Sequence, residues 1–129
     1  MHAEIAFDGG ARPNPGPAAI GYVVRTADGE ETHSEHIGES TNNRAEYRAL
    51  ITALERALEL GCTRASVEGD SELVVKQVNG EYGVNSGDIR PLHARVEELA
   101  AEFSAFAIEH VDRGDNHRAD ALVDAAFDD

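Results

Sequence analysis

The stretch NRAEYRALITALERALELGCTRASVE (residues 43–68) decides the fold class, because it joins a long helix to a short strand. Apolar residues recur in it at three- and four-residue spacing, from Ala45 through Leu50 and Leu54 to Leu58. That period is typical of an amphipathic helix, and Gly61 is a natural stop for it. The short segment 65–68 that follows predicts a strand. A strand therefore follows a helix here.

The residues before this stretch predict three strands. Ala3–Phe7 is a short apolar run that ends in Asp8-Gly9-Gly10, which we interpret as a turn signal. Ile20–Arg25 alternates in polarity and leads, through a turn at Ala27-Asp28-Gly29, to a third strand near Thr32–Ile37. Three strands joined by turns favour an antiparallel meander.

The residues after it continue the alternation of strands and helices. Helices are expected at Ser71–Val78, near Pro91–Phe103 and at Asn116–Phe127, with a strand near Ala105–Val111. Strand–helix–strand connections call for right-handed parallel crossovers, and the meander before them makes the sheet mixed. Without a repeat or a linker in the sequence, we expect one α/β domain over residues 1–129.

The charge balance is strongly acidic. Asp and Glu number 25 against 11 Lys and Arg, which gives a formal net charge of −14, and Lys76 is the one lysine. Nucleic-acid binders usually carry a basic patch, so composition alone argues against such a partner. Two explanations stay open: adaptation to a salt-rich cytoplasm, where salt screens repulsion between surface carboxylates, or an ordinary soluble acidic protein.

Cysteine usage and hydropathy indicate the compartment. Cys62 is the single cysteine, which fits a reducing cytoplasm. The sequence has neither the pattern of a signal peptide nor a run of about 20 apolar residues. We therefore expect a cytoplasmic protein with no membrane partner, and a monomer because no apolar surface stripe is evident.

Four acids lie at the ends of these expected elements, and each has an ordinary structural explanation. Asp8 suits a turn, Glu46 suits a capping-box-like pair with Asn43, Asp70 suits a helix N-cap, and Asp120 suits the positive end of a helix dipole.

Taken together, the four acids indicate a metal site. A mixed sheet with parallel crossovers can bring them to one edge, where ligands gather at strand ends. Converging carboxylates repel one another unless cations bind, and magnesium and manganese prefer oxygen ligands. Two such ions activate a water and stabilise the leaving oxygen of a phosphodiester, so no protein nucleophile is needed.

Four motifs in series resemble those of the type 1 ribonucleases H. They are FDGGARPNPGP (residues 7–17), TNNRAE (41–46), GDSELV (69–74) and NHRAD (116–120), and together they span nearly the whole chain. The resemblance implies a five-stranded mixed sheet with flanking helices, and hydrolysis of the RNA strand of RNA–DNA hybrids.

The same resemblance implies roles for particular residues. Asp8, Glu46, Asp70 and Asp120 would hold two magnesium or manganese ions. The amides of Asn14, Asn42 and Asn43 would enter the minor groove of the hybrid and reach the RNA 2′-hydroxyls, Thr41 would contact a phosphate of the DNA strand, and Gly9 and Gly10 would lie against the substrate. Turn and cap duty is the other explanation for the asparagines.

The chain departs from bacterial relatives at three places. Those relatives carry a histidine before the last acid that is thought to help product leave; here Arg113 lies nearer that position than His110, so both are candidate auxiliary residues. Glu39 stands where some relatives have a basic residue, and residues 79–91 are too few for the basic extra helix. A binder that uses amides and metals instead of cations should lose little affinity in salt.

Three other functions remain to be weighed. A related two-metal nuclease could act on DNA, although amides aimed at 2′-hydroxyls would then be idle. A non-catalytic hybrid-binding module would be favoured by loss of one acid, yet all four are present. The third alternative, an acidic interaction protein, leaves the ordered motifs unexplained.

Overall fold

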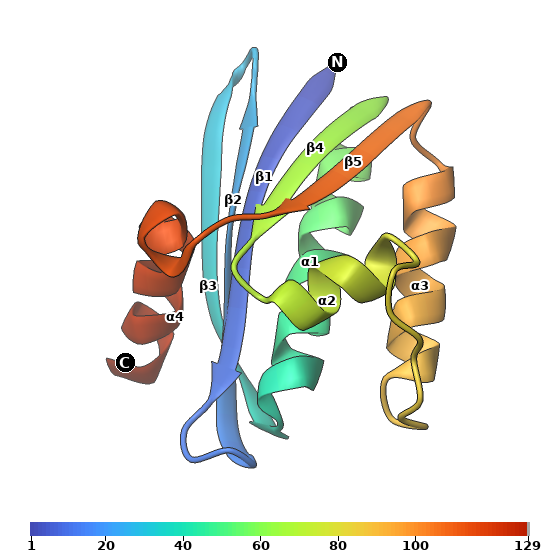
Figure 1. Cartoon of the computed structure of the whole chain (residues 1–129). Helices are drawn as coiled ribbons and strands as arrows, with labels where there is room; N and C mark the ends of the chain where they lie inside the picture. Colours follow the sequence, from blue (N-terminus) through green and yellow to red (C-terminus); the bar gives the residue numbers. More distant parts are fainter. Residues whose placement is uncertain (129) are drawn as a thin grey trace.

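The computed structural model describes residues 1–128 as a five-stranded sheet with helices on both faces (Figure 1). The strands are β1 (His2–Ala11), β2 (Gly16–Thr26), β3 (Gly29–Ser40), β4 (Arg64–Gly69) and β5 (Ala105–His110). The helices are α1 (Asn42–Glu59), α2 (Glu72–Val78), α3 (Arg90–Ala101) and α4 (His117–Asp128), with a 3-10 turn, η1 (Arg113–Asn116), before α4.

The sheet is mixed, as the sequence predicts. Its strand order is β3-β2-β1-β4-β5. The pairs β1–β2 and β2–β3 are antiparallel, which confirms the meander, while β1–β4 and β4–β5 are parallel, which confirms the two crossovers. The central strand β1 therefore separates the antiparallel part of the sheet from the parallel part.

Helices α1, α2 and α3 cover one face of the sheet, and α4 covers part of the other (Figure 1). The main core lies under the three helices and includes Phe7, Tyr47 and Leu50, none of which is exposed. A small cluster on the opposite face joins Ala19 of β2 to Val123 of α4. Neighbouring residues of β2 point to opposite faces, so this strand serves both layers.

The turn predicted at Asp8-Gly9-Gly10 is wrong. The three residues continue β1 and pair with Gly21, Ile20 and Ala19 of β2. Packing requires a glycine at position 9, because a Cβ there would lie 2.4 Å from the backbone of Ala45 in α1. Sequence alone does not reveal that a helix approaches the strand this closely.

The other expected elements are present with small shifts at their ends. The predicted strands 20–25 and 32–37 extend to Gly16–Thr26 and Gly29–Ser40. The last helix was predicted from Asn116, but residues 113–116 form η1 and α4 begins at His117. Among the described residues, the helices are too short or too polar to cross a membrane.

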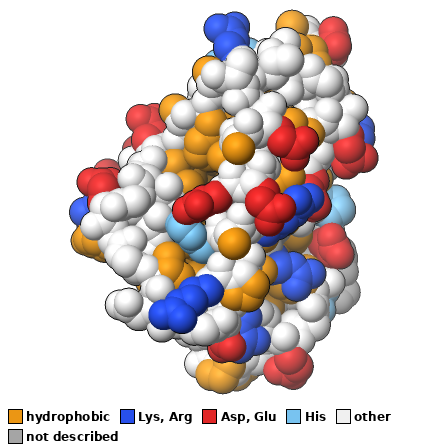
Figure 2. All heavy atoms as spheres, turned by 90° about the vertical axis from the view of Figure 1, so that its right-hand side faces the viewer, with side chains coloured by type: hydrophobic (Ala, Val, Ile, Leu, Met, Phe, Trp, Pro, Cys, Tyr) orange, Lys and Arg blue, Asp and Glu red, His pale blue; other side chains and the backbone are white. Residues whose placement is uncertain are grey.

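Acidic and basic side chains are interspersed on the face that carries α3 and β5 (Figure 2). Many cations pair with acids: Arg56 with Glu31, Arg95 with Glu55, and Arg118 with Glu30. Many of the few cations are therefore engaged in ion pairs within the protein.

Adding a methyl group at Gly9 should destabilise the fold, whereas adding one at Gly10 should not. A Cβ at Gly9 would meet the α1 backbone at 2.4 Å, but at Gly10 the nearest atom is Asn42 Oδ1 at 3.6 Å, an ordinary contact. Urea unfolding should show a loss of about 2 kcal/mol or more for Gly9→Ala and under about 1 kcal/mol for Gly10→Ala. Equal losses in the two variants would contradict the packing argument.

Candidate active site

Asp8 lies on the central strand β1, just past the end of its pairing with β4. That pairing stops at Phe7 and Gly69, so Asp8 and Asp70 both lie at the carboxyl end of β4. The Asp8 side chain is nearly buried, with 8% of the residue exposed. The strand ends thus bring together two acids that are far apart in sequence.

Glu46 reaches the same place from α1. It is 5% exposed, and its Oε1 accepts a hydrogen bond of 2.6 Å from the Gly9 amide. Its other oxygen, Oε2, is buried and has no hydrogen-bond partner among residues 1–128. The capping-box explanation is wrong, because α1 is capped by Thr41, whose hydroxyl accepts from the Arg44 amide.

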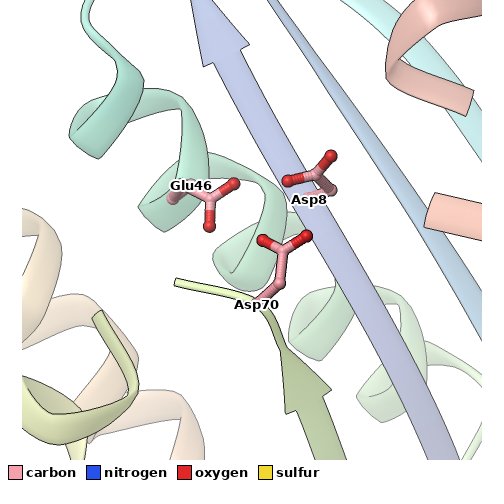
Figure 3. A group of neighbouring side chains, drawn as sticks. All are labelled: Asp8, Glu46 and Asp70. Carbon is pink, nitrogen blue, oxygen red and sulfur yellow. The ribbon is translucent and has the colours of Figure 1, made fainter. Parts of the chain in front are cut away.

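Asp70 is half-buried and stands between β4 and α2. The N-cap explanation is wrong here too, because Ser71 caps α2 by accepting from the Val74 amide. The Asp70 carboxylate therefore does not cap α2. It points toward those of Asp8 and Glu46 (Figure 3), and oxygens of the three residues lie within 4.8 Å of one another.

Asp120 comes to the site from the opposite layer. It lies in the first turn of α4, as predicted, and its side chain is 25% exposed. Together with the other three acids it lines a pocket of about 320 Å³. Its Oδ1 lies 3.5 Å from Nη2 of Arg113, a cation that lines the same pocket.

The site is electrostatically unfavourable as it stands. Burial raises the pKa of Asp8 to about 7, and the nearby Asp70 and Asp120 add to the rise although the Glu46 contact opposes it. Burial, followed by the contact with Asp8, raises the pKa of Glu46 well above its ordinary value. The charge of Asp120 is the main cause of a raised pKa for Arg113. Carboxylates gathered in this way favour a bound cation.

The donor set fits a hard divalent metal. Asp8, Glu46, Asp70 and Asp120 offer carboxylate oxygens only, which magnesium and manganese prefer. The buried, unpaired Oε2 of Glu46 is costly without a partner and would gain one on metal binding. The arrangement can therefore hold metal where the like charges meet.

Four of the six predicted substrate-contact residues, namely Gly9, Gly10, Asn42 and Asn43, line the pocket. The two others lie beside it. Asn14 Oδ1 accepts from the Asn42 amide at 3.1 Å, while Asn42 Oδ1 accepts from the Ala11 amide at 2.8 Å. Asn14, Asn42 and the cap residue Thr41 thus also have structural duties.

The two candidate auxiliary residues lie differently. Arg113 lines the pocket and its side chain is 77% exposed. His110 ends β5, is exposed, and is absent from the pocket lining. The pocket is also lined by Arg12, Ser71 and Val123, for which the sequence predicts no role in the site. Of these three residues, only Ser71 could have been predicted near the site, because it directly follows Asp70 at the start of a helix.

In the absence of divalent metal, the free energy of unfolding should fall as the pH rises from about 4 to about 7. The pKa of Asp8 is raised from 3.8 to about 7, so in this range the native state binds more protons than the unfolded state and loses stability as they leave. Asp8→Asn should make the fall shallower and, at 1.36 kcal/mol per pKa unit, stabilise the metal-free protein at pH 7 by up to about 4 kcal/mol.

Urea unfolding in chelator across this pH range measures both effects. Asp28→Asn, on the exposed β2–β3 turn, is the charge-matched control and should leave the slope unchanged. Stability that rises with pH across the window in the wild-type chain would contradict the site's electrostatics.

The sequence matches the protein family described as reverse transcriptase-like over residues 6–126. It is 46% identical over 125 residues to ribonuclease HI of Halobacterium salinarum, covering 95% of this chain and 63% of the relative. It is 44% identical over 131 residues to a bifunctional protein of Mycobacterium tuberculosis, covering 99% of this chain and 36% of the relative. The chain thus spans roughly one to two thirds of the length of these relatives.

Solved structures agree in fold and in length. The crystal structure of RNase H1 from H. salinarum superimposes with a TM-score of 0.94 at 44% identity, covering 99% of this chain and 98% of that one. The structure of LC11-RNase H1 in complex with an RNA/DNA hybrid superimposes with a TM-score of 0.90 at 39% identity, covering 98% and 96%. With the four acids at one pocket and these similarities along its whole length, the chain belongs to the type 1 ribonuclease H family.

Proposed function

We propose that this protein hydrolyses the RNA strand of RNA–DNA hybrids at internal positions, with the help of two divalent metal ions. The observation that carries the proposal is the meeting of Asp8, Glu46 and Asp70 within 4.8 Å, with Asp120 in the same pocket. The family relationship supports it, as does the hybrid bound by the similar LC11-RNase H1.

Magnesium or manganese is the proposed metal, held by Asp8, Glu46, Asp70 and Asp120. When bound, two such ions activate a water and stabilise the leaving oxygen of a phosphodiester. The chain's own contribution is to hold the acids in place before metal arrives. The Gly9 amide fixes one oxygen of Glu46, pairing with β2 fixes the backbone of Asp8, and Asp70 directly follows the paired end of β4.

The proposed hybrid interface presents amide donors. Because backbone amides already donate to Oδ1 of Asn14 and of Asn42, the side-chain NH₂ groups are the parts left to meet a ligand. Acceptors line the minor groove of a duplex, and the 2′-hydroxyl oxygens of RNA lie there as well. Asn43 at the pocket adds a third amide. Structural duty and substrate contact are thus compatible in Asn14 and Asn42.

Thr41 and the glycines complete the proposed interface. The Thr41 hydroxyl accepts from Arg44, which leaves its own hydrogen free to donate to a phosphate of the DNA strand. The N-terminus of α1 beside it favours an anion. Gly10 leaves the pocket wall free of a side chain, so that a nucleic-acid backbone can approach closely, and Gly9, whose Cβ position faces α1, lines the pocket beside it.

Arg113 is the proposed auxiliary residue. Its exposed guanidinium beside Asp120 can contact a phosphate and move away with it, which would ease product release. His110 remains the second candidate from the sequence, although it stands outside the pocket lining.

A DNA nuclease and a non-catalytic hybrid-binding module are the alternatives. The amide donors at the pocket favour a ligand with 2′-hydroxyls over DNA alone. Four intact acids, two of them with raised pKa values, favour catalysis over simple binding, since perturbed carboxylates of this kind cluster at functional sites.

We further propose that residues 1–129 form a single ribonuclease H domain that works as a monomer in a salt-rich cytoplasm. The net charge of −14 supports the last point, because salt screens repulsion between surface acids.

Asp70→Asn should abolish cleavage while the fold survives. Removing one ligand charge should lower the rate by more than about 100-fold, since even indirect supports of metal ligands contribute 10- to 100-fold. The assay uses a hybrid labelled on the RNA strand, with magnesium and with manganese, and with Asp28→Asn as control. Binding of hybrid without cleavage by the wild type would favour the binding module, and cleavage of DNA alone would favour the other nuclease.

Hybrid binding should depend only weakly on salt. Each phosphate contacted by lysine or arginine adds about 0.9 to the slope of log K against log salt, and many cations here pair with the protein's own acids. Fluorescence anisotropy with Asp70→Asn should give a slope of magnitude below about 5. A slope that corresponds to six or more released counterions would overturn the amide-based interface.

A further inference from the structure

Asp120 is the one acid of the four that does not belong to the β1–α1–β4 unit. It is carried by α4, which packs on the opposite face of the sheet from α1 (Figure 1). The connection from β5 to α4 crosses the edge of the sheet before the helix begins (Figure 1). The distance between Asp120 and Asp8 therefore depends on what ties the start of α4 to β1.

Asn116 makes that tie. It is the last residue of η1, directly before α4, and is 2% exposed. Its Nδ2 donates a hydrogen bond of 2.9 Å to the carbonyl oxygen of Phe7, the residue that precedes Asp8. Asn116 is also four residues before Asp120, about one turn away along the chain. The side chain of Asn116 thus joins the backbone next to Asp8 to the start of α4, the helix that carries Asp120.

The bond has one permitted orientation. A carbonyl oxygen can only accept, so the amide NH₂ of Asn116 must face Phe7. Its Oδ1 is buried and has no partner among residues 1–128. An unpaired buried oxygen is costly, so the side chain is held here at some expense to stability.

Apart from the apolar packing of Val123 and Ala126 on β2, the polar contacts that hold α4 itself are exposed, and they include two ion pairs. Arg118 pairs with Glu30, with side chains 46% and 31% exposed, and Arg12 pairs with Asp124, with side chains 49% and 51% exposed. Salt screens pairs of this kind, and they contribute little. The buried, uncharged bond from Asn116 is not weakened in this way, which would matter in the salt-rich cytoplasm proposed above.

We propose that Asn116 is a positioning residue for the metal site: it fixes Asp120 relative to Asp8 through the Phe7 carbonyl. The inference rests on the proposed function, but it concerns a residue outside the lining of the pocket that holds the four acids. According to the proposal, the hydrogen bond between Asn116 of η1 and Phe7 of β1 sets the position of Asp120.

Asn79 is a control of the same residue type within the same chain, exposed where Asn116 is buried. It caps the C-terminal end of α2, and its Nδ2 donates a hydrogen bond of 3.0 Å to the carbonyl oxygen of Ile108 in β5. It therefore makes the same kind of side-chain bond to a strand backbone, but it holds none of the four acids. Its loss should affect stability alone.

The test compares Asn116→Ala, Asn79→Ala, Asp120→Asn and the double variant Asn116→Ala/Asp120→Asn. Three quantities are measured: the free energy of unfolding in urea, the Mn²⁺ dissociation constant by calorimetry, and kcat and KM on the hybrid. Both asparagine variants should lose stability. Only Asn116→Ala should weaken Mn²⁺ binding and lower kcat, each by about 10- to 100-fold, with KM nearly unchanged.

The double variant tests whether Asn116 acts through Asp120. Once Asp120 has lost its charge, removing Asn116 should weaken Mn²⁺ binding by less than about twofold more. Full additivity, or equal effects of Asn116→Ala and Asn79→Ala on Mn²⁺ binding, would overturn the proposal. If Asn116→Ala does not fold, Asn116→Ser, whose hydroxyl is too short to replace the amide, is held to the same expectations.

The outcomes separate this inference from the proposed function. A wild-type chain that binds Mn²⁺ but never cleaves the hybrid would refute the function, and the calorimetric comparison would still decide the role of Asn116. A wild-type chain that cleaves, with Asn116→Ala no worse than Asn79→Ala, would refute the positioning role alone.

Discussion

Repulsion among carboxylates is the constraint on which the rest of the structure depends. Oxygens of Asp8, Glu46 and Asp70 lie within 4.8 Å of one another, and two of these residues are almost buried. Without a bound cation, this arrangement of like charges lowers the stability of the fold. The fold tolerates it because each acid is attached to an element with a large apolar core behind it: β1 and α1 share Phe7, Tyr47 and Leu50. The stability supplied by that core offsets the cost of a site built to receive cations.

Much of the fold could be predicted from the sequence because periodicity reports it directly. The apolar spacing from Ala45 to Leu58 gave α1, and alternating strands and helices gave the mixed sheet. The Asp8-Gly10 turn failed because glycine has two uses, in turns and at close contacts, and only the position of α1 shows that Gly9 serves the second. The caps at Thr41 and Ser71 were missed for a related reason: neighbouring polar residues compete for the same role.

The candidate site was predictable to the extent that it follows from strand and helix ends. The pocket brings all four predicted acids together, and the substrate-contact assignments stay predictions. The positioning role proposed for Asn116 could not have been recognised from the motif NHRAD, because it depends on a bond across 109 positions to the backbone of Phe7. The distinction between Arg113 and His110 likewise needs the path of the chain after β5, which sends one side chain to the pocket and leaves the other outside.

A net charge of −14 is compatible with the proposed binding of nucleic acid, because the donors of the proposed interface are mostly uncharged amides and a hydroxyl. In the proposed interface, amides and a hydroxyl recognise the groove and the phosphate, metal would neutralise the acids, and many arginines already pair with the protein's own acids. The most direct test is anomalous diffraction from crystals of the Asp70→Asn variant, which is expected to bind the hybrid without cleaving it, grown with Mn²⁺ and an RNA–DNA hybrid. The account predicts Mn²⁺ among Asp8, Glu46 and Asp120 with the RNA strand against it and the asparagine amides in the minor groove. Hybrid bound elsewhere, or the DNA strand over the acids, would contradict it.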